Sequence, residues 1–152
     1  DTAMLTEHPL HTMADWSGDH FKTSDEARSC YCLRLMLLHE REQELLILPA
    51  APQQWLEDGN HISVRDMVTY FGIVSFEVKS SIGEGLIRVS LIPPVRRVPE
   101  TITLRLIHPR GLKILKVLVD ECAHTDFEPE TSLVRLRNIE KPVEMTIYYG
   151  SF

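Results

Sequence analysis

From residue 42 onward, apolar and polar residues alternate in short runs that are separated by turn-forming residues. The clearest run is IVSFEVKS, where Val74, Phe76 and Val78 alternate with polar or charged residues. Alternation with a period of two is typical of a strand that has one buried face. About eight such segments follow one another, with turn signals roughly every 8–12 residues. The sequence therefore predicts a mainly β protein, an antiparallel β-sandwich.

The same alternation recurs in TITLRLIH and in the closing VEMTIYY. Between the strand-like runs IVSFEVKS and GLIRVSLI lies SIGE, whose glycines suit a hairpin turn. The strand-like part of the chain contains no long crossover helix, which excludes a doubly wound α/β fold. In the two later segments, the side chains expected to face the core are Ile102, Leu104, Leu106, Val143, Met145, Ile147 and Tyr149.

One α-helix is expected ahead of the strands, over residues 23–41. Thr23 and Glu26 have the spacing of a capping box at its start. Its second half, LRLMLLHE, is apolar around almost the whole circumference, whereas a helix on one sheet needs only one apolar stripe. We therefore expect protein on several sides of this helix. Residues 1–22 are polar without a clear period and predict an irregular arm, and residues 42–152 form the sandwich.

Charge and composition narrow the classes of function. The net charge is −6 and the basic residues are scattered, which argues against nucleic-acid binding. No run reaches the ~18 apolar residues of a membrane span, and the N-terminus lacks a signal-peptide pattern, so we expect a soluble protein. The odd number of cysteines, Cys30, Cys32 and Cys122, argues against a disulfide framework. We expect reduced, buried thiols and a reducing, cytoplasmic compartment.

Metal and cofactor binding have weak support. His8 and His11, with Asp15, Asp19 and His20 nearby, are residue types that bind zinc. They lie in the predicted irregular arm, so we expect a solvated or partner-packed segment and no metal. The segment GEGL is too short to cradle a nucleotide, and we expect no cofactor.

Two groups of residues contain side-chain types that occur in active sites. Glu40 and Glu44 could act as a pair of carboxyl groups only if one helix continued through both, and a solvated charge cluster is the preferred interpretation. Cys122, His124 and Asp126 share one loop, but a nucleophilic thiol needs a lowered pKa, and we expect Cys122 to fill a loop pocket. No catalytic residue is assigned.

Three aromatic residues in connecting segments are the best candidates for a binding surface: Trp55, Tyr70 and Phe71. Their rings could stack on sugars, because aromatic faces pair with apolar C–H surfaces. Aromatic side chains are also common anchors where two proteins or domains pack together. We favour domain packing and keep carbohydrate binding as the alternative.

Residues 29–149 resemble the C-terminal end of a group of bacterial glycoside hydrolases, six-hairpin enzymes in which an (α/α)6 barrel precedes a β-sandwich. The resemblance lies in CLRLMLLHE, in ELLILPAAPQQWLEDGNHISVRDMVTYFGIVSFEVKS and in LRLIHPRGLKILKVLVD followed by TDFEPETSLVRL. It implies that the helix is the last helix of a barrel and that the three aromatic residues lie at the barrel interface. The catalytic acid and base of such enzymes lie in the barrel, so none is carried over to this chain.

These observations together predict a non-catalytic accessory domain that packs on a helical catalytic barrel and stabilises it. Two alternatives remain open from the sequence. One is a stand-alone carbohydrate-binding module that uses the three aromatic residues. The other is a module that self-associates through the apolar helix at residues 24–40.

Overall fold

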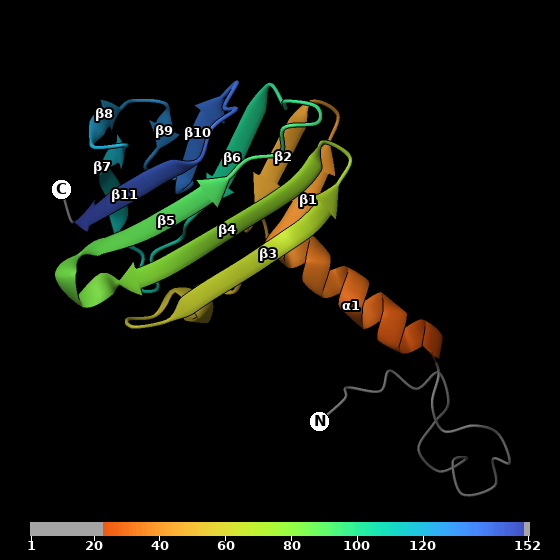
Figure 1. The fold of residues 1–152 in the computed structure, drawn as a ribbon. Coiled ribbons are helices and arrows are strands. Elements are labelled where there is room, and N and C mark those ends of the chain that lie inside the picture. The colour runs from red at the N-terminus through yellow and green to blue at the C-terminus, as the bar shows by residue number, and fades with distance from the viewer. Residues whose placement is uncertain (1–22, 151–152) are drawn as a thin grey trace, which may run out of the picture.

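The computed structural model describes residues 23–150, with side chains from Ala27 onward, so the capping box predicted for Thr23 and Glu26 lies outside the described side chains. One helix leads into two packed β-sheets (Figure 1). In chain order the elements are α1 (Thr23–Leu37), β1 (Leu38–Arg41), β2 (Glu44–Ile47), η2 (Gln53–Leu56), β3 (His61–Thr69), β4 (Gly72–Ser81), η3 (Ile82–Glu84), β5 (Leu86–Ile92), β6 (Thr101–Arg105), β7 (Lys113–Val119), β8 (Cys122–His124), β9 (Phe127–Glu128), β10 (Leu133–Arg137) and β11 (Val143–Gly150).

The prediction of a mainly β sandwich with one N-terminal helix is confirmed. One sheet has the strand order β1-β2-β6-β10-β9, and the other has the order β3-β4-β5-β11-β7-β8. The described residues form more strands than the eight expected, because β1, β8 and β9 have only two to four residues and show no period. Neighbouring strands are antiparallel except β2 and β6, which are parallel. The chain visits the other sheet between these two strands, and such a crossover permits parallel pairing.

The core lies between the two sheets. Ile102 and Leu104 of β6 have no exposed surface, and Phe76 of the opposite sheet is only 2% exposed. Burying one such side chain contributes about 1.5–3 kcal/mol, so this layer supplies most of the stability. The inward-facing residues predicted from alternation are all buried: Val74, Phe76, Val78, Ile102, Leu104, Leu106, Val143, Met145, Ile147 and Tyr149.

The helix is shorter than the predicted range of 23–41. It ends at Leu37, and the next four residues form β1, which pairs with β2 in a hairpin with Leu38 opposite Ile47. Leu38 has no exposed surface, so its burial in the sandwich outweighs the local preference for helix. Within residues 23–150, no helix combines the length and the apolar character needed to cross a lipid bilayer.

A β-bulge explains why the segment before IVSFEVKS does not alternate. The pairing of β3 with β4 shifts register between Val64 and Met67. Asp66 adopts a positive φ of 51° there, and its amide donates a hydrogen bond to the Ser75 hydroxyl at 2.9 Å. Val64 before the bulge and Thr69 after it are both buried, so the bulge keeps both halves of β3 on the core.

The three cysteines are free, but the prediction that they are buried is wrong. Cys30 and Cys32 lie on α1, which projects away from the sandwich, and both are exposed (Figure 1). Cys122 lies on β8 at the edge of the six-stranded sheet and is also exposed, so it does not fill a loop pocket.

Candidate functional site

The three aromatic candidates occupy different environments. Phe71 is completely buried, Tyr70 is 62% exposed, and Trp55 is half-buried on η2. The nine residues of β3 separate η2 from the Tyr70–Phe71 turn, which is a length of about 30 Å. The structure therefore does not bring these rings together on one platform.

Tyr70 is held at the junction between α1 and the β3–β4 hairpin. Its amide donates a hydrogen bond to Glu40 at 2.5 Å, and Arg34 of α1 pairs with the same carboxylate at 3.5 Å. Arg34 also donates to the Val68 carbonyl at 2.9 Å. The guanidinium of Arg97 lies 4.8 Å from the centroid of the Tyr70 ring and donates to its hydroxyl at 2.5 Å. These contacts fix the end of α1 to the hairpin.

Exposed apolar side chains gather around this junction, and we call them the apolar end surface. Val68 and Ile73 lie directly opposite each other on β3 and β4 and are 69% and 58% exposed. Ile92 pairs with Ser75, two residues from Ile73 on the same face of the sheet. The surface comprises Val68, Tyr70, Ile73, Ile92 and Val95. Tyr31 and Leu33 are exposed on the adjoining helix α1, on different faces of it.

Neither group of catalytic candidates is arranged for catalysis. Glu40 pairs with Leu45 on the inward face of its hairpin, whereas Glu44 lies opposite Arg41 on the outward face. The two carboxyl groups therefore point to opposite sides of the sheet and cannot flank one bond. His124 contacts the carbonyl of Arg135 at 2.8 Å. Among the described residues, no hydrogen bond joins the exposed Cys122 to His124.

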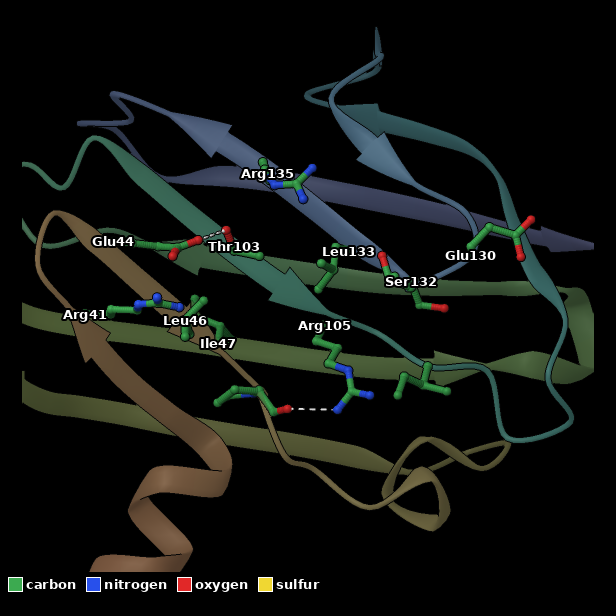
Figure 2. Close-up of a pocket in the computed structure, with 13 residues that line it drawn as sticks. Arg41, Glu44, Leu46, Ile47, Thr103, Arg105, Glu130, Ser132, Leu133 and Arg135 are labelled. Carbon is green, nitrogen blue, oxygen red and sulfur yellow. Dashed lines mark hydrogen bonds between the residues drawn. The ribbon is translucent and has the colours of Figure 1, made fainter.

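The outward face of the five-stranded sheet carries a groove (Figure 2). The strand register places Leu46, Thr103 and Arg135 beside one another there, because Leu46 pairs with Thr103 and Thr103 pairs with Arg135. The groove has a volume of about 630 Å³. A second depression of about 500 Å³ adjoins it and shares three of its side chains. The lining of the groove includes Arg41, Glu44, Leu46, Thr103, Arg105, Glu130 and Arg135.

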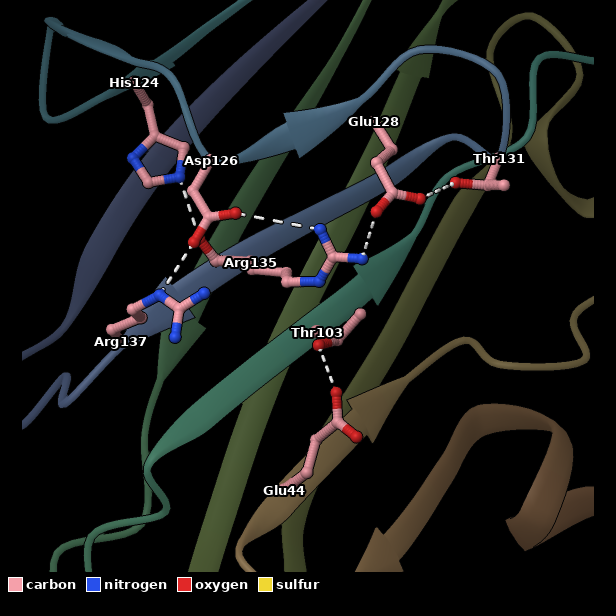
Figure 3. Close-up of polar contacts among 8 residues, drawn as sticks. All are labelled: Glu44, Thr103, His124, Asp126, Glu128, Thr131, Arg135 and Arg137. Carbon is pink, nitrogen blue, oxygen red and sulfur yellow. Dashed lines mark hydrogen bonds and ion pairs between the residues drawn. The ribbon is translucent and has the colours of Figure 1, made fainter.

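A network of ion pairs closes one side of this groove (Figure 3). Arg135 donates to Glu128 at 2.6 Å and lies 3.7 Å from Asp126, to which Arg137 donates at 2.8 Å. Thr131 donates to the second oxygen of Glu128 at 2.7 Å. Hydrogen bonds from Thr131 and Arg135 lower the pKa of Glu128, and the bond from Arg137 lowers the pKa of Asp126. A general acid needs a raised pKa, so this pair is suited to structure rather than to proton donation.

His108 should make the protein less stable as the pH falls. Its ring is 1% exposed, Nδ1 accepts a hydrogen bond from the Arg110 amide at 3.0 Å, and Nε2 has no partner among the described residues. Burial, and then the charge of Arg110, lower its pKa below the usual value. The unfolded chain therefore binds a proton near pH 6.5 while the native state does not, and stability decreases as the pH falls through that value.

Urea unfolding at pH 7 and pH 5 would measure this effect. We expect His108→Gln to lose less stability between the two pH values than the unsubstituted protein. His39→Gln, which removes an exposed histidine, controls for the loss of an imidazole. An equal loss in the unsubstituted protein and in His108→Gln would contradict the assignment.

The metal hypothesis falls outside the described part of the chain. His8, His11, Asp15, Asp19 and His20 all precede residue 23. Within residues 23–150, no group of three or more His, Cys, Asp or Glu side chains is placed to hold a metal ion.

The fold and its surfaces define a mainly β sandwich module with one projecting helix. No protein-family model matches this chain, and no curated protein is similar enough to count as a match. The function of this chain is therefore inferred from the geometry of the molecule and from the resemblance carried by residues 29–149.

Sequence reasoning missed most of the groove. Arg135 and Arg105 occupy outward positions of alternating strands, which is a signal that the sequence contains. The parallel pairing that sets Leu46 beside Thr103 has no local signal, because β2 and β6 are far apart in the chain. The groove could therefore be found only from the structure.

Proposed function

We propose that this chain is a non-catalytic module that packs on a helical domain through α1 and the apolar end surface. One observation carries the proposal. Of the nine large exposed hydrophobic side chains among the described residues, all except Leu112 and Leu115 lie either on that surface or on α1. A concentration of apolar side chains at one end of a molecule is typical of an interface with another protein or domain.

The exposed side of α1 favours a helical partner. The sandwich covers only the end of α1, where Leu35, Met36 and Leu37 are half-buried, while Leu33 is 48% exposed. Rows of leucine and methionine on a helix pack between the rows of another helix. The resemblance to six-hairpin glycoside hydrolases supports the same partner, since their sandwich follows an (α/α)6 barrel. We take that barrel as the occupant and the parent protein as a glycoside hydrolase.

The carboxyl groups support the non-catalytic part of the proposal. Hydrolysis of a glycosidic bond needs two carboxyl groups on either side of it, and one must keep its proton at neutral pH. Glu40 and Glu44 lie on opposite faces of their hairpin, and Asp126 and Glu128 have lowered pKa values.

A binding experiment tests the docking function. The segment encoded upstream of Asp1 is produced as a separate protein, and its affinity for this chain is measured by calorimetry. We expect this segment to be a helical protein that binds the chain. Leu33→Glu should lower the affinity at least about tenfold, because a charge then faces an apolar interface. Leu112→Glu changes an exposed leucine outside the apolar end surface and should bind like the unsubstituted chain.

Two outcomes would overturn the docking function. The first is an upstream segment that encodes no helical domain, and the second is full affinity in Leu33→Glu. Sedimentation of the chain alone addresses the self-association alternative. A dimer that dissociates in Leu33→Glu, but not in Leu112→Glu, would favour that alternative.

A further inference from the structure

The last turn of α1 is attached to the five-stranded sheet. The helix runs directly into β1, because α1 ends at Leu37 and β1 begins at Leu38. The Leu37 carbonyl accepts a hydrogen bond from the Leu48 amide at 2.8 Å, and the Met36 carbonyl accepts one from the Ala50 amide at 3.4 Å. These bonds occupy carbonyls that the end of a helix leaves free. They all lie within two residues of the helix end, so a further contact is needed to fix the direction of α1.

Arg34 supplies that contact and reaches the other sheet. Its Nη2 atom donates a hydrogen bond to the Val68 carbonyl of β3 at 2.9 Å and lies 3.5 Å from a carboxylate oxygen of Glu40 on β1. The other oxygen of Glu40 accepts a hydrogen bond from the Tyr70 amide at 2.5 Å. These contacts, which we call the Arg34 network, join α1, β1 and the β3–β4 hairpin.

The Arg34 network includes residues of the apolar end surface itself. Val68 and Tyr70 contribute exposed side chains to that surface and backbone groups to the network. The network therefore sets the direction of α1, which projects away from the sandwich, relative to the apolar end surface (Figure 1). A helix that had to find its direction during binding would lose conformational entropy at that step, whereas a helix that is already held has lost it beforehand.

We propose that Arg34 is a positioning residue that holds α1 and the apolar end surface at one angle, and that the partner is a rigid body that contacts both at once. The inference rests on the proposed docking function and adds a geometric requirement for the partner. A helical domain whose surface fits the angle between α1 and the sheet meets this requirement. A partner that contacts α1 alone would not depend on the Arg34 network.

The distance between α1 and the sandwich tests the positioning role directly. Cys30 on α1 and Cys122 on β8 are exposed and free, so both can carry a spin label once Cys32 is replaced by alanine. Pulsed electron paramagnetic resonance then measures the distribution of distances between the two labels. We expect one narrow distribution, which becomes broader in Arg34→Ala. Arg28→Ala removes another arginine, which is exposed on the same helix, and should leave the distribution narrow.

The affinity for the helical segment encoded upstream of Asp1 tests whether the partner uses the fixed angle. Arg34→Ala should weaken binding about fivefold or more, because the direction of α1 must then be fixed during binding. Glu40→Ala breaks the same network from β1 and should also weaken binding. The double substitution should bind nearly as well as Arg34→Ala, because the two side chains act through one network.

The positioning role would be contradicted by any of three results. The first is a distribution in Arg34→Ala as narrow as in the unsubstituted chain, and the second is a broad distribution in the unsubstituted chain. The third is full affinity of Arg34→Ala although its distribution has broadened. Each of these results leaves the docking function standing. If the unsubstituted chain binds no upstream helical segment, the docking function fails and the inference fails with it.

Discussion

Replacing Phe71 by alanine should lower the free energy of unfolding by about 3–5 kcal/mol. The ring has no exposed surface and belongs to the cluster of buried side chains between the sheets. Removing it leaves a cavity that the surrounding strands can only partly fill, because the Thr69 hydroxyl and the Arg97 amide hold the turn in place. The Phe71 amide donates to that hydroxyl at 3.1 Å, and its carbonyl accepts from Arg97 at 2.9 Å. Urea unfolding followed by circular dichroism would measure the loss.

Tyr70→Ala is the matched control for this experiment. The neighbouring ring is 62% exposed and contacts Arg97, so its removal should cost about 1 kcal/mol or less. Comparing the two variants also shows which ring is available to a ligand, because an exposed ring contributes little to stability. Equal stability losses in Phe71→Ala and Tyr70→Ala would mean that Phe71 is not a core residue.

Gly72→Ala should have the second largest effect, a loss of about 2–4 kcal/mol. Gly72 has a φ of +128°, a conformation that residues with a side chain rarely adopt. An added Cβ would also lie 3.1 Å from the Cβ of Arg96 and 3.5 Å from that of Pro94. Strain and close contact therefore act together at the residue that ends the Tyr70–Phe71 turn. Thermal unfolding would show the effect as a lower midpoint temperature.

Gly59→Ala separates strain from contact. Gly59 has a φ of +78°, but an added Cβ would have nothing within 4 Å. Its substitution should therefore cost only about 1 kcal/mol, from the left-handed backbone alone. If Gly72→Ala were no more destabilising than Gly59→Ala, that result would contradict the close packing of the segment around Arg96 against the turn.

The turn containing Tyr70 and Phe71 illustrates the limit of sequence reasoning for the candidate surface. Both residues are aromatic neighbours in a loop, and nothing local tells which one is buried. The bulge between Val64 and Met67 changes the phase of β3, and the turn then directs Phe71 into the core and Tyr70 outward. That bulge depends on pairing with β4, so the two rings could be distinguished only in the folded chain.

The end of the helix shows the same limit of sequence-based prediction, here for the fold. The LHER segment continues the apolar pattern of α1, and local preference allows a helix through Arg41. Pairing with β2 and complete burial of Leu38 make it a strand instead. The stabilisation from these tertiary contacts exceeds the few tenths of a kcal/mol per residue by which the helix propensities of ordinary residues differ.

By itself, the sequence determined the mainly β class, the inward-facing side chains of the long strands and the unusual apolar character of the helix. Those features are local, because a period of two or an apolar circumference can be counted along the chain. Only the tertiary structure decided that β2 lies parallel to β6, that Arg41, Glu44 and Arg105 share one groove, and that exposed apolar side chains gather where α1 meets the sandwich. These are contacts between residues far apart in the sequence, and their register depends on how two whole sheets pack.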